Sequence, residues 1–280
     1  VYKRQVQRLR ERQEDQQRQR NRLEALLARH WPELGGLLKL TSVTLAALIA
    51  EIGSPRYLCA FADKGAQAIR TASRGKLDEE TIEAILQSAR TTLGMPCVSE
   101  ENARLRALGE DLKRIHKDIL RLTQAIAIEV EFAAAEDERE AQPRSGELKR
   151  MSAVLGAVSA AALYASVGPP SAYLSAQGYL KALGLNLKEH SSGKHKGRLK
   201  ITKRGDPRAR FYLYFAALRL IAKQPLIDRW FRAKSQRPGA CKRKIVVELM
   251  RRIAKGLWHQ GQGDLFAVDK LFAPQPSRGV

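Results

Sequence analysis

A serine pair inside a basic, glycine-punctuated segment is the part of this sequence best suited to chemistry. Ser191-Ser192-Gly193 lies within LNLKEHSSGKHKGRLKITKRG, residues 185–205. A serine hydroxyl becomes a nucleophile when its proton is removed or when cations stabilise its alkoxide. Lysines and arginines around an attacked phosphate would supply that positive field. The residues alone leave two interpretations open: a nucleophile, or a loop serine that only touches nucleic acid.

Positive charge surrounds the serine pair, with ten basic and two acidic residues between Lys188 and Arg219. Basic side chains of this kind hold the sugar-phosphate backbone, and glycines let it approach closely. The alternative is a solvated basic surface. We expect phosphate contacts from Lys194, Lys196, Arg198, Lys200, Lys203, Arg204, Arg208 and Arg210, and close backbone approach at Gly193, Gly197 and Gly205.

Two short elements must position this segment. The alternation in residues 199–203 predicts a strand with Leu199 and Ile201 inward and Lys200 outward. Asp206-Pro207 then predicts a helix start, with Asp206 as the N-cap. Cations in a first turn oppose the helix dipole, and a phosphate bound at that helix end would offset this cost.

A heptad pattern marks residues 99–130. Its apolar positions are spaced three and four apart, which is typical of a coiled-coil seam. The pattern leaves three interpretations open: a coiled coil that joins subunits, a helix that packs back on residues 1–29, or one helix of an ordinary bundle. The seam consists of Leu105, Leu108, Leu112, Ile115, Ile119, Leu122 and Ile126.

The composition predicts an all-α, mainly helical fold, since good helix formers dominate and aromatics are only 6%. We expect a helical, coiled-coil half (1–140), a linker (141–147) and a compact helical domain (148–280) with a short basic β-ribbon or loop. The apolar stretch from Met151 to Gly168 is rich in small residues, and we interpret it as one core helix rather than a membrane span.

A net charge of +21 favours nucleic acid as the partner, with an anionic membrane surface as the rival. The three cysteines are far apart, which argues against a disulfide framework and fits a cytoplasmic, nucleoid-associated protein. His190 and His195 form no zinc pattern with the remote Cys241, so we predict no metal site.

Residues 184–220, GLNLKEHSSGKHKGRLKITKRGDPRARFYLYFAALRL, resemble the C-terminal domain of insertion-sequence-110 family transposases. LGAVSAAALYASVGPPSAY and the closing segment WFRAKSQRPGACKRKIVVELMRRIAKGLWH also resemble that domain. The resemblance implies RNA-guided DNA recombination, in which a structured bridge RNA pairs with target and donor DNA. It also implies a serine that bonds covalently to DNA phosphate; Ser192 is our candidate, with Ser191 as the fallback.

The family also has a RuvC-like N-terminal domain with four acidic metal ligands, and nothing here matches its first strand. We therefore expect a partial chain without a cofactor of its own, to which Mg²⁺ comes only if the missing acidic domain is supplied. The expected partners are DNA, the guide RNA and further copies of the chain, with no membrane. The alternative function is a non-catalytic DNA- or RNA-binding remnant or regulator that oligomerises through its coiled coil.

Overall fold

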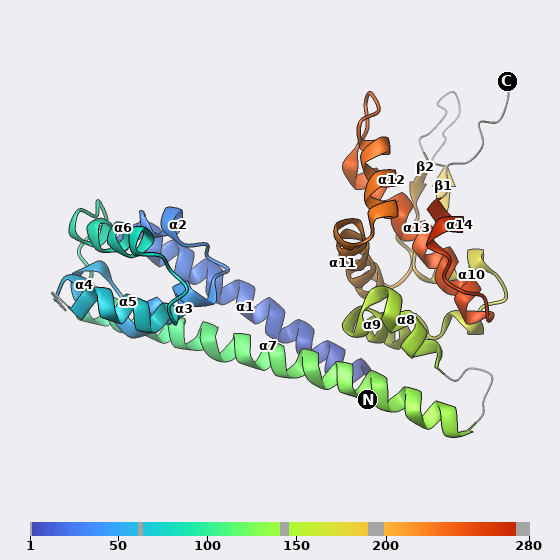
Figure 1. The fold of residues 1–280 in the computed structure, drawn as a ribbon, viewed down its shortest axis with the longest axis horizontal. Helices are drawn as coiled ribbons and strands as arrows, with labels where there is room; N and C mark the ends of the chain where they lie inside the picture. The colour runs from blue at the N-terminus through green and yellow to red at the C-terminus, as the bar shows by residue number, and fades with distance from the viewer. Residues whose placement is uncertain (1, 61–63, 141–145, 190–198, 273–280) are drawn as a thin grey trace. The chain divides into compact units, whose positions relative to one another are not determined.

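The predicted all-α class is confirmed, since helices dominate and the described residues hold two short strands (Figure 1). The computed structural model describes residues 2–60, 64–140, 146–189 and 199–272, with the backbone alone at 133–140, 189 and 199. The chain divides into two compact units, one of Gln7–Leu122 and one of Val1–Val6 with Thr123–Val280. None of the described helices combines the length and the apolar character that crossing a bilayer requires.

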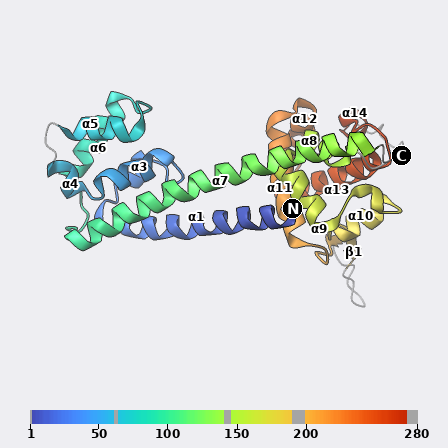
Figure 2. The same ribbon diagram turned by 90° about the horizontal axis from the view of Figure 1, so that it is seen from below.

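Two long helices frame the unit of residues 7–122. Over this unit α1 (Tyr2–His30) and α7 (Ser99–Glu140) lie side by side and antiparallel (Figures 1 and 2). Ion pairs join Arg12 Nε to Asp118 Oδ2 at 3.6 Å and Arg29 Nη1 to Glu101 Oε1 at 3.2 Å. The shorter helices between them are α2 (Leu34–Leu37), α3 (Val43–Ile52), α4 (Pro55–Ala60), α5 (Gly65–Ser73) and α6 (Glu79–Arg90).

Side-chain caps mark the starts of two short helices, and a glycine ends one of them. Ser42 caps α3 by accepting from the Thr44 amide at 3.1 Å, and Gly53 ends it with a φ of +82°. Asp78 caps α6 by accepting from the Thr81 amide at 2.8 Å. Each cap satisfies an amide that has no partner within its helix.

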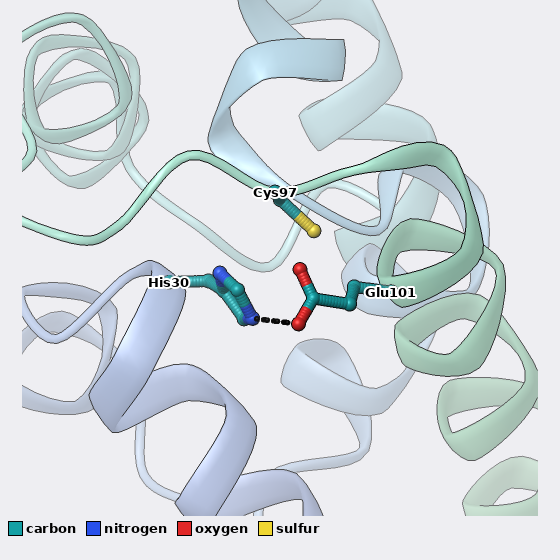
Figure 3. A group of neighbouring side chains, drawn as sticks. All are labelled: His30, Cys97 and Glu101. Atoms are coloured by element: carbon teal, nitrogen blue, oxygen red, sulfur yellow. Dashed lines mark ion pairs between the residues drawn. The ribbon is translucent and has the colours of Figure 1, made fainter.

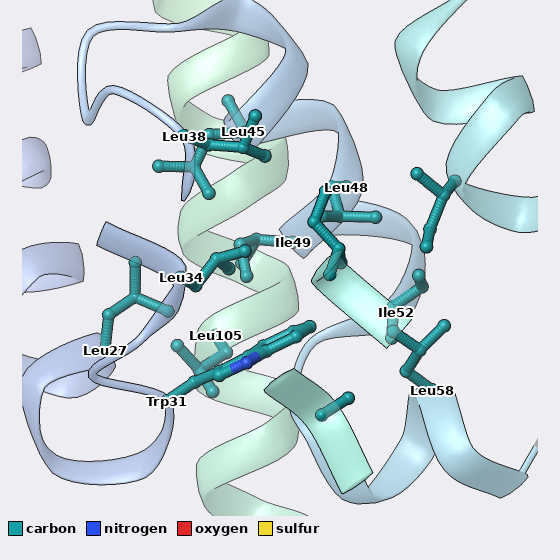
Figure 4. Close-up of a cluster of buried hydrophobic side chains, with 14 of the residues drawn as sticks. Leu27, Trp31, Leu34, Leu38, Leu45, Leu48, Ile49, Ile52, Leu58 and Leu105 are labelled. Carbon is teal, nitrogen blue, oxygen red and sulfur yellow. The ribbon is translucent and has the colours of Figure 1, made fainter. Parts of the chain in front are cut away.

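A leucine-rich core holds this unit together (Figure 4). Trp31 lies fully buried at its centre, with its indole N–H donating to Ser88 Oγ at 3.0 Å. Gly109 lets α7 approach α3 closely, since a Cβ there would lie 2.4 Å from the backbone nitrogen of Ala50. The core therefore depends on a glycine contact as well as on leucine packing.

Part of the heptad seam is used inside the chain. Leu105 and Leu112 belong to the same core cluster as Leu23 and Leu27 of α1. Ile115 and Ile126 are also buried, and Leu108, Ile119 and Leu122 are half-buried. The helix runs to Glu140, beyond the end of the pattern at Val130. Seam packing against another subunit stays a prediction.

The other unit packs several helices around α13 (Lys242–Gly261), whose Leu249, Ile253 and Leu257 are fully buried. Three alanines of α9, residues 160–162, are also fully buried, as expected for a helix of small residues. The remaining elements are α8 (Glu147–Leu155), α9 (Ala157–Val167), η2 (Pro170–Ala172), α10 (Ala176–Ala182), β1 (Leu187–Glu189), β2 (Leu199–Ile201), α11 (Pro207–Lys223), α12 (Pro225–Ser235) and α14 (Val268–Phe272).

The expectation of one helix from Met151 to Gly168 is wrong. α8 ends at Leu155 and α9 begins at Ala157, because Gly156 takes a φ of +75° and a ψ of 151° between them. Only glycine adopts this backbone conformation at no steric cost, so the chain bends at that point. Residues 141–145 of the predicted linker lie outside the described residues, and the division of the chain there stays a prediction.

Candidate nucleic-acid interface

A two-stranded ribbon presents the segment that carries the serine pair. β1 and β2 are antiparallel, with Leu187 opposite Ile201, Lys188 opposite Lys200 and Glu189 opposite Leu199. Below the strands the Thr202 amide donates to Asn186 O at 2.9 Å, and the Thr202 hydroxyl donates to Asn186 Oδ1 at 2.6 Å. These bonds fix the base of the ribbon. The strand predicted for residues 199–203 is confirmed over Leu199–Ile201.

The nine residues that connect the strands lie outside the described residues. They include both candidate nucleophiles and five predicted contacts. The described ribbon therefore fixes where this connection leaves and rejoins the domain. The site predictions that fall on it stay predictions: Ser191, Ser192, Gly193, Lys194, Lys196, Gly197 and Arg198.

Two lysines face each other across the ribbon. Lys188 and Lys200 are directly opposite and both are exposed. Residues directly opposite in an antiparallel pair share a face of the ribbon, and like charges in that relation are destabilising. Neither lysine has an ion-pair partner among the described residues. An anion bound on this face would offset the repulsion.

A tight turn joins the ribbon to α11. Lys203 takes the left-handed conformation, with a φ of +55°, and its amide donates to Gly184 O at 3.0 Å. Gly205 packs against the backbone of residues 182–184, where a Cβ would lie 2.0 Å from Ala182 O. This packing within the protein is enough to require a glycine at position 205. Close approach of a ligand to Gly205 stays a prediction.

The start of α11 is the predicted one, with Pro207 at the first position and Asp206 as the cap. Asp206 Oδ1 accepts from the Arg208 amide at 2.7 Å, and Oδ2 accepts from Arg208 Nη2 at 3.1 Å. Burial acts to raise the pKa of Asp206, but the bonds from the Arg208 side chain and backbone outweigh it and hold this pKa below its ordinary value. The same ion pair raises the pKa of Arg208.

Arg208 and Arg210, two of the four arginines predicted to bind phosphate, therefore have partners within the chain. Arg210 Nη1 donates to Leu183 O at 3.2 Å and to Gly205 O at 2.7 Å, which fastens α11 to the turn. Arg208 is paired with Asp206. By contrast, the exposed Lys203 and Arg204 have no ion-pair partner in the part of the chain that the structure describes. With Lys188 and Lys200, they are the accessible cations at the base of the ribbon.

An open polar hollow lies beside the ribbon, bordered by Lys181, Asn186, Leu187 and Arg251. The Arg251 guanidinium donates to Leu185 O from α13, so the central helix of the unit also holds the start of β1. Burial lowers the pKa of Arg251. Two basic side chains with amide groups between them make this hollow suitable for an anion.

Sequence reasoning missed an aromatic strip on α11. Phe211 and Phe215 lie one helical turn apart with ring centroids 4.8 Å apart, and each is about half exposed, at 49% and 51%. The i, i+4 spacing was visible in the sequence, but periodicity alone does not tell an exposed aromatic face from a buried one. Exposed rings near cations are typical of surfaces on which nucleobases stack.

It also missed a second basic group, at the start of α13. Lys242, Arg243 and Lys244 are all exposed in the first turn of that helix, which has no acidic residue. The run CKRK at residues 241–244 is the signal in the sequence for this basic group.

Comparison with known families matches residues 148–232 to the model described as Transposase IS116/IS110/IS902 family. The matched segment contains α8 to α11 and most of α12, with the whole ribbon. The search of curated proteins found no match to the chain.

Proposed function

We propose that this chain is a transposase of a mobile element that exchanges DNA strands with a serine nucleophile, since residues 148–232 match the IS116/IS110/IS902 transposase family. The observation that carries the proposal is the ribbon: its unpaired, like-charged face flanks the connection that contains Ser191 and Ser192. A phosphate held against Lys188 and Lys200 would lie close to the segment that must deliver the hydroxyl.

The proposed step is a transesterification. A bond forms between Ser192 Oγ and the DNA phosphorus, and the bond from phosphorus to one sugar oxygen breaks. The serine proton ends on the departing sugar oxygen, so the number of phosphodiester bonds is conserved. Lys200, Lys203 and Arg204 would hold the backbone on either side. The hydroxyl of Ser191 is the alternative nucleophile.

The magnesium chemistry of the family does not fit the described residues near the ribbon. Asp206 is the one acid between residues 199 and 227, and its carboxylate is engaged by the α11 cap and Arg208. Mg²⁺ requires several oxygen ligands in octahedral geometry. The acidic ligands would therefore come from a domain outside this sequence, and no step of the proposal passes through the metal.

We further propose that a structured guide RNA binds together with DNA. A chain that holds two nucleic acids needs more than one basic surface, and the first turn of α13 offers three exposed cations besides those of the ribbon. Phe211 and Phe215 would receive unpaired bases. Assembly of more than one copy is the remaining part of the proposal.

The test is a covalent protein–DNA adduct. Full-length protein is incubated with the element's end DNA, guide RNA and Mg²⁺, with the acidic domain added, and adducts are separated under denaturing conditions. We expect Ser192→Ala to abolish the adduct and Ser191→Ala to retain most of it. The reverse pattern assigns the reaction to Ser191. Salt-sensitive binding without any adduct contradicts the catalytic proposal and favours a nucleic-acid-binding remnant or regulator.

A further inference from the structure

Three metal-ligating side chains meet where α1 ends and α7 begins, in the unit of residues 7–122 (Figure 3). His30 is the last residue of α1, Cys97 lies in the segment before α7, and Glu101 is in the first turn of α7. One ligand atom from each lies within 4.8 Å of the other two. None of them takes part in the proposed recombination.

The orientation of His30 is the observation that points to a ligand. The side chain is fully buried, and its Nδ1 lies 3.0 Å from Met95 O. A carbonyl only accepts, so Nδ1 carries the proton and Nε2 faces the other two side chains. Nε2 has no hydrogen-bond partner among the described residues and lies 3.5 Å from Glu101 Oε1. A backbone carbonyl that holds the far ring nitrogen is the usual support of a metal-binding histidine.

Glu101 is held from both sides. Its Oε2 accepts from the Val98 amide at 3.4 Å, which satisfies a backbone N–H at the start of α7. Its Oε1 also lies 3.2 Å from Arg29 Nη1, on the exposed side. The carboxylate is thus fixed with one oxygen toward His30.

Cys97 completes the group from the interior. Its residue is 3% exposed, and burial raises the pKa of its thiol. A buried thiol loses its proton when a metal replaces it, and the proton passes to solvent. A divalent cation, one thiolate and one carboxylate sum to zero charge, which suits a site buried in a leucine-rich core.

We propose that His30 Nε2, Cys97 Sγ and one Glu101 oxygen bind a single Zn²⁺, with a water as the fourth ligand. Imidazole, thiolate and carboxylate together match zinc better than Mg²⁺ or Ca²⁺, which take oxygen ligands. The bound zinc would join His30 to Cys97, which are 67 residues apart in the sequence, and would tie the end of α1 to the segment that leads into α7.

Zinc content and cobalt substitution of the tag-free, full-length chain test this site. We expect one zinc per chain, and a thiolate-to-cobalt charge-transfer band when Co²⁺ replaces it. Cys97→Ser should abolish the band, and Glu101→Gln, whose amide oxygen can still accept from the Val98 amide, should weaken zinc binding by more than the ~10–100-fold typical of losing a residue that only supports a ligand.

Two matched controls separate the site from its surroundings. Arg29→Gln removes the ion pair to Glu101 but none of the three ligands, and Cys241→Ser removes an exposed thiol. Both should keep the metal and the band. Absence of stoichiometric zinc and of the cobalt band in the unmodified chain overturns the proposal, and so does zinc that Cys97→Ser retains. The zinc content and the cobalt band are measured on the unmodified chain, so the proposal can still be overturned if a variant fails to fold.

Discussion

The basic side chains around the ribbon fall into two groups that residue type does not distinguish. Some bind partners within the chain, and others are exposed without an ion-pair partner among the described residues. Arg208 and Arg210 lie in one helical turn, yet their guanidinium groups bind Asp206 and two backbone carbonyls. Lys203 and Arg204 next to them are exposed and have no ion-pair partner among the described residues. The guanidinium groups of the first pair are already held by partners within the chain, so the second pair is better placed to bind phosphate.

Asp206 gives a prediction about stability. Asp206→Ala removes a helix cap and should lower the free energy of unfolding by about 1 kcal/mol at neutral pH. The pKa of Asp206 in the folded chain lies below the ordinary value of 3.8, so its contribution is complete above that value and is lost as the pH falls through the folded pKa. Urea unfolding over this pH range measures the difference.

Asp206→Asn is the matched variant, since asparagine caps a helix as well as aspartate does but carries no charge. It should keep most of the stability and lose the dependence on pH. A pH dependence that survives in Asp206→Asn would show that another group causes it.

At the scale of elements, the ribbon places two like charges opposite each other, on the face that we propose binds an anion. Its strands are three residues each, and they place Lys188 opposite Lys200. The bonds from Thr202 to Asn186 and from Lys203 to Gly184, at the base of the ribbon, offset the repulsion between the two lysines. Two like charges directly opposite each other destabilise the free ribbon, and a bound phosphate would offset their repulsion.

The double variant Lys188→Gln, Lys200→Gln tests whether these two lysines bind DNA and destabilise the free ribbon. We expect weaker DNA binding and a slope of log Kobs against log salt that is shallower by about 0.9 for each lost phosphate contact. Thermal stability should stay the same or rise. Fluorescence titrations over a salt series measure the slope. Lys64→Gln, Lys76→Gln removes two exposed lysines of the other unit as a control; equal effects in both pairs would refute a specific role for the ribbon.

The contact between α3 and α7 supports a second prediction at this scale. Gly109→Ala should gain up to about 1 kcal/mol in helix propensity. The new Cβ would lie 2.4 Å from Ala50 N and 2.8 Å from Ala46 O, which are backbone atoms that cannot rotate away. Overpacking costs about 1–3 kcal/mol, so the net effect should be destabilising.

Urea unfolding of the full chain measures this effect. Gly36→Ala is the control, because nothing lies within 4 Å of its Cβ position; that variant should be neutral or stabilised. A stabilised Gly109→Ala would mean that α3 and α7 separate without cost.

At the scale of the whole molecule, the proposed assembly of copies of the chain needs an exposed apolar surface. Leu105 and Leu112 are committed to the core of their own unit, so that part of the seam is not free for a partner. Farther along α7, Ile128 and Phe132 are 47% and 64% exposed and lie one turn apart. We expect assembly to use this exposed face.

Ile128→Ser, Phe132→Ser should therefore reduce an oligomer to monomers in sedimentation velocity without changing the helical signal, because both side chains are already largely in solvent. Leu112→Ser should instead lower thermal stability, since its side chain is buried. A monomeric unmodified chain, or an oligomer indifferent to the double variant, would contradict this assignment.

The sequence by itself determined what depends on neighbours along the chain. Helix caps at Ser42, Asp78 and Asp206, the strand at 199–201 and the helical class follow from residue type and short spacing, which act locally. Only the tertiary structure decided the rest. The bend at Gly156, the bond from Arg210 to Leu183 and the meeting of His30 with Cys97 depend on backbone conformation and on contacts between distant residues. Neither is encoded in local periodicity, because packing alone selects which distant side chains meet.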